Sequence, residues 1–116
     1  DIDRMLRKRF TLRQKVDLAC TCTFEGGERT ATMQNVSRGG CYLQSPVEGL
    51  REEEHGSVSL KVQGNGRSYQ LPGKVVWINR SGLHEKPVGF GWQFDRSQRA
   101  MMRYITLHFG QGMLIR

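Results

Sequence analysis

The chain has 116 residues, enough for one domain with a single hydrophobic core but not for two. Hydrophobic residues make up 37% and aromatic residues 9%, as in globular folds, and no apolar run approaches the roughly 20 residues of a membrane helix. The 18 lysines and arginines outnumber the 11 aspartates and glutamates, so the net charge is +7. This charge favours an anionic partner, such as a nucleotide, a nucleic acid or an acidic lipid, although a basic surface that serves solubility would carry the same charge.

The chain opens without a secretory signal peptide and begins with Asp1 rather than methionine, which suggests a cytoplasmic domain of a longer protein. Its three cysteines cannot all pair with one another, and the Cys20-x-Cys22 motif lacks the second ligand pair of a zinc site. We therefore expect Cys20, Cys22 and Cys41 to be reduced and partly buried, and we expect no metal.

The first residues show no strand pattern, and residues 7–13 contain four arginines or lysines in seven positions. A run of like charges with few apolar anchors favours a flexible segment. We predict a flexible basic arm over residues 1–13, a folded domain over residues 14–110 and a tail over residues 111–116.

From residue 15 onward, apolar and polar residues alternate in short segments, the pattern of strands with one buried face. In the first segment, Val16, Leu18, Cys20 and Cys22 alternate with polar or small residues. A bulge is expected inside the fifth segment, at Pro72–Gly73. The six predicted strands cover residues 15–23, 29–36, 41–44, 57–62, 68–79 and 88–94.

A helix is predicted after the last strand, over residues 96–109. Asp95 is a suitable N-cap with Gln98 in the capping-box position, and Gly110 is a suitable C-cap. Apolar side chains recur at helical spacing and are expected to face the core: Met101, Met102, Ile105 and Phe109. Three arginines fall on the opposite side and are expected to face solvent: Arg96, Arg99 and Arg103.

The order of these elements predicts the fold class. No helix separates consecutive strands, which argues against a parallel sheet. Six short strands followed by one amphipathic helix predict an all-β-dominated fold, a six-stranded antiparallel β-barrel with a C-terminal α-helix.

The sequence offers no catalytic constellation. His55, His84 and His108 are scattered, without carboxylates at useful spacing, and Ser37 lacks a nucleophile-elbow context. The glycine-rich stretches lead into strands rather than helices, so they are not phosphate-binding loops of the Walker type. We therefore interpret the chain as a binding module and not as an enzyme.

Two short motifs are candidates for binding an anionic ligand. In the first, Arg9 and Arg13 are four residues apart, and an arginine fork can bind a phosphate or a guanine edge with two hydrogen bonds. The spacing alone is a weak signal, because Arg99 and Arg103 repeat it. The second motif, residues 35–40, combines an amide, a hydroxyl and two glycines in one turn, a pattern also typical of turns that only cap strand ends.

Taken together, these motifs resemble the signature of the PilZ domain family. The family pattern Arg-x-x-x-Arg, then Asp/Asn-x-Ser-x-x-Gly, is similar to Arg9-x-x-x-Arg13 followed by Asn35-x-Ser37-x-x-Gly40. The similarity continues through residues 73–77 and 89–94 into the final helix, so it covers nearly the whole chain. The resemblance implies a six-stranded barrel that binds the bacterial messenger cyclic di-GMP.

The resemblance also implies which residues bind. The family's binding roles fall on Arg9, Arg13, Asn35, Ser37 and Gly40, with Lys8, Arg38 and Trp77 as further candidates beside them. Asn35 stands where aspartate is commoner, which replaces a carboxylate acceptor by an amide carbonyl. Some family members place an aromatic residue at the position of Trp77 against the ligand, but a place in the barrel core is slightly favoured for it. In similar domains, a basic residue at the position of Lys8 accompanies the binding of two intercalated ligands, so we expect two ligands per domain here.

We further expect the ligand to order the N-terminal arm and so to signal to adjacent domains or a downstream protein. Two alternatives remain open. A basic β-barrel that binds nucleic acid would need exposed aromatic platforms, for which Phe10, Tyr42 and Trp77 are available, and nucleic acid is the less favoured partner. A PilZ-like domain that works through protein contacts would not need the binding motifs.

Overall fold

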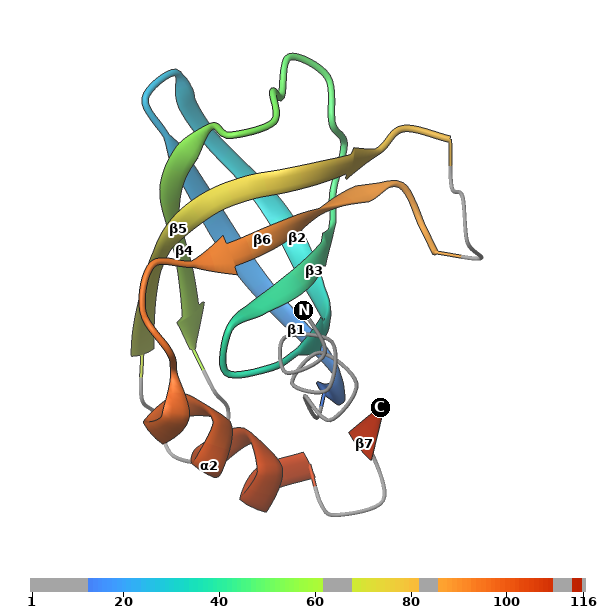
Figure 1. The fold of residues 1–116 in the computed structure, drawn as a ribbon. Coiled ribbons are helices and arrows are strands. Elements are labelled where there is room, and N and C mark those ends of the chain that lie inside the picture. The colour runs from blue at the N-terminus through green and yellow to red at the C-terminus, as the bar shows by residue number, and fades with distance from the viewer. Residues whose placement is uncertain (1–12, 62–67, 82–85, 110–113, 116) are drawn as a thin grey trace, which may run out of the picture.

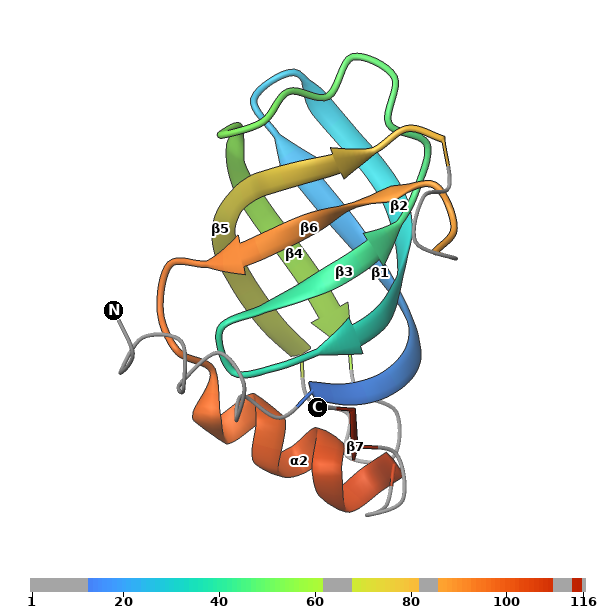
Figure 2. The ribbon, with the colours of Figure 1, turned by 45° about the vertical axis from the view of Figure 1, so that its right-hand side comes forward.

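The computed structural model describes residues 13–61, 68–81, 86–109 and 114–115, and all structural statements below concern these residues. The elements in chain order are β1 (Arg13–Phe24), β2 (Gly27–Val36), β3 (Gly40–Gln44), β4 (His55–Lys61), β5 (Ser68–Asn79), β6 (Gly89–Phe94), α2 (Arg99–Phe109) and β7 (Leu114–Ile115). The strands wrap into a barrel, and α2 lies across one of its ends in both views (Figures 1 and 2).

All strand pairs are antiparallel, in the order β2-β3-β6-β5-β4-β1, and the pairing of β1 with β2 closes the ring. This confirms the predicted six-stranded antiparallel β-barrel with a C-terminal helix. The short strand β7 was not predicted and lies within the expected tail. It pairs with Arg13 and Gln14 at the start of β1, near the lower end of the barrel in Figure 1. This is the same edge of β1 that pairs with β4 over residues 20–24.

The barrel interior is filled by alternate side chains of each strand, as the period of two predicts. At its centre Trp92 is 1% exposed, donates from Nε1 to the Leu71 carbonyl at 3.1 Å, and meets Phe24 edge to face with ring centroids 5.8 Å apart. Met101 and Ile105 of α2 are fully buried against this core. The three cysteines are free and buried.

The helix begins later than the sequence predicts, at Arg99 rather than residue 96, and the Asp95 N-cap is wrong. The Gln98 carbonyl accepts the first helical hydrogen bond, from the Met102 N–H at 3.0 Å, so Gln98 is the N-cap. The Asp95 N–H instead donates to the Pro72 carbonyl at 2.8 Å and prolongs the pairing between β5 and the end of β6. The three arginines of the predicted basic stripe are exposed, as expected. The predicted C-cap, Gly110, lies outside the described residues.

The predicted bulge at Pro72–Gly73 is also wrong. The register between β4 and β5 runs through this dipeptide without interruption, and the irregularity of β5 lies instead between Val75 and Trp77, against β6. Glycine at position 73 is needed for close approach, because a Cβ there would lie 2.1 Å from the Gln93 carbonyl oxygen. The actual bulge places Val76 and Trp77 side by side on the outer face, opposite Gly91.

Candidate ligand-binding site on the outer barrel face

The candidate site is a hollow of about 750 Å³ on the outside of the barrel, over β3, β6 and β5. Its floor follows one row of residues that are partners across three strands, Tyr42 on β3, Gly91 on β6 and Trp77 on β5. Asn35 on β2 continues this row beside the hollow, as the partner of Tyr42. The lining residues are Arg13, Ser37, Gly39, Gly40, Cys41, Tyr42, Val76, Trp77, Lys86, Gly91, Trp92 and Gln93.

An aromatic pair crosses this floor. The rings of Tyr42 and Trp77 have centroids 5.6 Å apart and are tilted by 32°, although a whole strand lies between their backbones. They can meet because Gly91 has no side chain, since a Cβ at this position would lie 2.4 Å from Trp77 Nε1. Trp77 is therefore half-buried on the outer face, and its slightly favoured placement in the core is wrong, because the core tryptophan is Trp92.

The hydroxyl of Tyr42 is held by a small polar network behind the hollow. It donates to the Pro87 carbonyl and accepts from Asn79 Nδ2 at 3.3 Å, and Asn79 itself is 1% exposed. Burial raises the pKa of Tyr42, with the Asn79 hydrogen bond acting in the opposite direction, so the phenol stays neutral at physiological pH. The ring is thus fixed at both ends, by its strand and by its hydroxyl.

Two cations border the hollow. Arg13 donates from Nη1 to Asn35 Oδ1 at 3.2 Å, and the Lys86 ammonium lies 4.9 Å from the centroid of the Tyr42 ring. Burial lowers the pKa of Lys86, and the positive charge of Arg13 lowers it further. Among the residues that the structure describes, no aspartate or glutamate lines the hollow. Two cations beside an aromatic pair, without a carboxylate, suit a ligand that carries both negative charge and a planar ring.

The loop between β2 and β3 forms a tight turn at the edge of the hollow. The Ser37 N–H donates to the Gly40 carbonyl at 2.8 Å, and Ser37 Oγ accepts from the Gly39 N–H at 3.3 Å. Gly40 is required for close approach, because a Cβ there would lie 2.4 Å from the Trp92 carbonyl oxygen. The hydroxyl and backbone of this turn are therefore held against β6, facing the site.

The same turn is tied to the closing helix. The Gly39 carbonyl accepts from the Phe94 N–H at 2.9 Å, and the Arg38 carbonyl accepts from the Gln98 N–H at 2.7 Å, directly before α2. The side chain of Arg38 is exposed and is not among the lining residues. Through these two bonds the turn, the end of β6 and the start of α2 are connected.

The structure brings together many of the residues proposed from the sequence. Arg13, Ser37, Gly40 and Trp77 line the hollow, and Asn35 lies next to it as the partner of Arg13. Arg38 contributes its backbone to the turn, as described above. Lys8 and Arg9 lie outside the described residues.

Sequence reasoning did not assign a ligand-binding role to Tyr42, Lys86 or Gly91. A signal for Gly91 existed, because the alternation of aromatic residues and glycine over residues 89–94 indicates a strand with one bare face. The sequence offers Tyr42 only as an exposed platform for nucleic acid, and this interpretation is wrong, because Tyr42 is 2% exposed. Nothing in the sequence around Lys86 distinguished it from other surface lysines.

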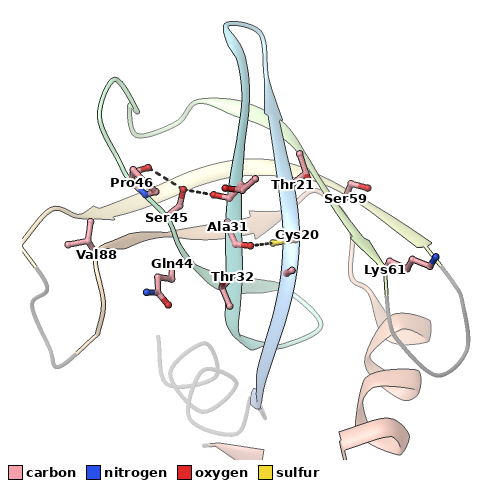
Figure 3. A pocket seen from close by; sticks show the side chains of 12 residues that line it. Cys20, Thr21, Ala31, Thr32, Gln44, Ser45, Pro46, Ser59, Lys61 and Val88 are labelled. Atoms are coloured by element: carbon pink, nitrogen blue, oxygen red, sulfur yellow. Dashed lines mark hydrogen bonds between the residues drawn. The ribbon is translucent and has the colours of Figure 1, made fainter.

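A second hollow, of about 820 Å³, lies on the outer face over β1 and β2 and the strands beside them (Figure 3). Small uncharged side chains dominate its lining, such as Thr21, Thr32 and Ser59. Within the described part of the chain, Lys61 is the one charged residue of this lining, and no aromatic ring contributes to it. It therefore lacks the paired cations and stacking surface of the first hollow, and we do not assign the ligand to it.

Metal and membrane features were also considered for the part of the chain that the structure describes. No three histidine, cysteine or acidic side chains gather there in a way that could hold a metal ion. No described helix is both long enough and apolar enough to cross a membrane.

Comparisons with known proteins agree with this geometry. The family model of the PilZ domain matches residues 7–108. The fold is similar to the PilZ domain of CeSA from a cellulose synthesizing bacterium, with a TM-score of 0.59 and 16% identity over 84% of this chain and 95% of that one. It is also similar to the Bacillus subtilis inhibitor of motility (MotI/DgrA), with a TM-score of 0.61 and 16% identity over 86% of this chain and 48% of that one. A search of curated proteins gives no significant match.

Proposed function

Because this chain belongs to the PilZ domain family, we propose that it is a receptor for cyclic di-GMP and that the ligand occupies the hollow over β3, β6 and β5. PilZ domains are ligand-binding and regulatory domains, and they are generally cyclic di-GMP receptors. The observation that supports the proposal most is the hollow itself, in which Arg13 and Lys86 border the Tyr42–Trp77 pair without any lining carboxylate.

Cyclic di-GMP carries two phosphates and two guanines, and the site offers a complement to each. The Arg13 guanidinium, together with Arg9 from the same motif, binds phosphate or a guanine edge through paired hydrogen bonds. The half-buried ring of Trp77 provides an aromatic surface next to which a guanine can stack, and the buried Tyr42 ring supports it from the side. Ser37 adds a hydroxyl at the edge of the hollow.

Asn35 has a positioning role in this proposal. Its side-chain oxygen already accepts a hydrogen bond from Arg13 Nη1, so it holds the guanidinium at the site. An aspartate at this position would form a stronger, charge-assisted bond with the arginine. The amide leaves the positive charge of Arg13 less neutralised, and that charge remains available to the phosphates.

Isothermal titration calorimetry tests the proposed function. Cyclic di-GMP is titrated beside GTP, cyclic GMP and an oligonucleotide, and saturable binding is expected for cyclic di-GMP only. Binding of the oligonucleotide alone would instead support the nucleic-acid-binding alternative.

The same experiment measures stoichiometry, for which we propose two ligands per domain with Lys8 as an additional phosphate partner. One ligand per chain, unchanged in Lys8→Ala, would contradict that stoichiometry.

Substitution of Gly91 by alanine is expected to weaken ligand binding while the barrel stays folded. The added Cβ would collide with the Trp77 indole, a side chain that can turn outward, and so would break the aromatic pair. Base–aromatic stacking contributes about 1–3 kcal/mol, so the dissociation constant should rise by roughly 5- to 150-fold. Titration and thermal melting of the variant measure the two effects separately.

Gly89→Ala is the matched control on the same strand. A Cβ at Gly89 would lie 2.1 Å from the Leu43 carbonyl oxygen, which is backbone and cannot turn away. This variant should therefore lose stability, whereas Gly91→Ala should lose mainly affinity. Wild-type affinity in a folded Gly91→Ala variant would show that the aromatic pair does not contact the ligand.

We further propose that the ligand signals by ordering the N-terminal arm, as the sequence suggests. A ligand that bridges Arg9 and Arg13 to the turn at residues 35–40 would draw this arm across the site. Ordering costs roughly 1–2 kcal/mol per backbone residue, so only a short segment near residues 7–13 can be fixed in this way.

Amide hydrogen exchange tests the arm. On addition of cyclic di-GMP, protection is expected to increase over residues 7–13 and 35–41, and to change less over residues 99–109. If residues 7–13 are equally protected without ligand, the arm is preformed and ligand-induced ordering is excluded.

A further inference from the structure

The segment that follows the described end of β5 returns to the barrel at residues 86–88, and two contacts hold it there. The Tyr42 hydroxyl donates to the Pro87 carbonyl, and the Ser45 N–H donates to the Val88 carbonyl at 3.2 Å. Both donors belong to β3 or the residue directly after it. The backbone directly after Lys86 is therefore held against β3, and the lysine lies at the rim of the hollow.

Lys86 points its charge into the site. Its ammonium lies over the Tyr42 ring, 4.9 Å from the centroid, and its side chain lines the hollow and is half-buried. Arg13 is near enough for its charge to depress the pKa of the lysine, in addition to the effect of burial. Because no described carboxylate lines the hollow, the repulsion between these two cations would be relieved by an anionic ligand.

The two cations reach neighbouring positions of one row. Arg13 contacts Asn35, and Lys86 lies over Tyr42, and these two contacted residues are direct partners in the pairing of β2 with β3. A ligand with two separate anionic groups that lies along this row can place one group at each cation.

We propose that Lys86 is a phosphate-binding residue of this site and that it acts beside Arg13. This inference rests on the proposed function and adds to it a residue outside the two signature motifs. An ammonium suits the role, because it acts as a compact point charge with three donors that need no planar alignment. Tyr42 positions Lys86 in two ways: its ring lies beneath the ammonium, and its hydroxyl donates a hydrogen bond to the carbonyl of the next residue, Pro87.

The test separates the charge of Lys86 from its packing. Lys86→Met keeps an unbranched apolar stem over the Tyr42 ring and removes the charge, so the fold should melt near the wild-type temperature. The dissociation constant for cyclic di-GMP should rise about tenfold, the low end for a lost charged hydrogen bond at a half-exposed site. Lys86→Arg should recover much of the affinity. The difference between wild type and Lys86→Met should shrink as salt is added.

Lys61→Met is the matched control, because Lys61 is an exposed lysine beside the second hollow (Figure 3). It should bind cyclic di-GMP like the wild-type protein. If Arg13→Ala loses affinity and Lys86→Met does not, the role of Lys86 is overturned while the proposed function stands. If the wild-type protein does not bind cyclic di-GMP at all, the proposed function fails and this inference fails with it.

Discussion

Replacement of Arg13 by alanine is expected to weaken cyclic di-GMP binding by about 1.5–3 kcal/mol, or roughly 10- to 150-fold in the dissociation constant. The guanidinium lies at the edge of the hollow, is held by Asn35 Oδ1 at 3.2 Å, and has no lining carboxylate to neutralise it. A bidentate contact to phosphate or to a guanine edge would be lost entirely in the variant. Calorimetric titration measures this loss directly.

The stability of Arg13→Ala should change little, because the side chain is exposed and contributes nothing to the core. Arg99→Ala is the control, since Arg99 belongs to a second Arg-x-x-x-Arg pair but lies on the exposed face of α2. It should bind as the wild-type protein does. Ser37→Ala should lose less than Arg13→Ala, roughly 0.5–1.5 kcal/mol. Full affinity in Arg13→Ala would remove the residue from the site.

The strands could be predicted because their signal is local. In β1 every second side chain is buried, from Gln14 to Phe24, and this alternation is visible in the sequence as apolar residues two apart. The lack of helices between consecutive strands indicated antiparallel pairing. These two properties predicted an antiparallel barrel with a helix at its end. The order of the strands in the ring was not predicted, because β3 pairs with β6 and β4 pairs with β1, although β3 and β4 are consecutive in the chain.

The errors in the fold occur where a tertiary partner determines the local structure. Asp95 is a good N-cap by composition, but its N–H is used by the Pro72 carbonyl, so the helix starts one turn later. Pro72–Gly73 looks like a bulge, but Gly73 serves the close approach of Gln93 instead. Strand β7 has only two residues and takes its pairing from β1, so it has no pattern of its own.

Only the part of the candidate site that stands in local sequence motifs could be predicted. The signature residues Arg13, Asn35, Ser37 and Gly40 stand in two short motifs that can be read directly. Tyr42, Gly91 and Trp77 come together only through the register of three strands and the bulge after Val75, which the sequence does not specify. Lys86 joins them through a hydrogen bond to its neighbour Pro87, and single-sequence reasoning has no access to such a contact.

The two tryptophans should respond to substitution in opposite ways. Trp92→Ala is expected to lower the free energy of unfolding by about 3–5 kcal/mol, because it removes a buried ring, its hydrogen bond to the Leu71 carbonyl and its edge contacts with Phe24 and Phe90. That loss is a large part of the roughly 5–15 kcal/mol that keeps a domain folded. Trp77→Ala should cost only about 1 kcal/mol of stability, since its ring lies on the outer face, but about 1–3 kcal/mol of binding.

Urea denaturation and calorimetric titration of both variants separate these effects, and Trp92→Phe covers the case in which Trp92→Ala does not fold. The phenylalanine keeps most of the buried volume and loses the hydrogen bond to Leu71, so its stability should lie between wild type and Trp92→Ala. Trp92 lines the hollow but is only 1% exposed, and its ring lies in the barrel core. A folded Trp92→Phe should therefore bind cyclic di-GMP nearly as the wild-type protein does. Equal stability losses in Trp77→Ala and Trp92→Ala would mean that Trp77 supports the barrel rather than the ligand.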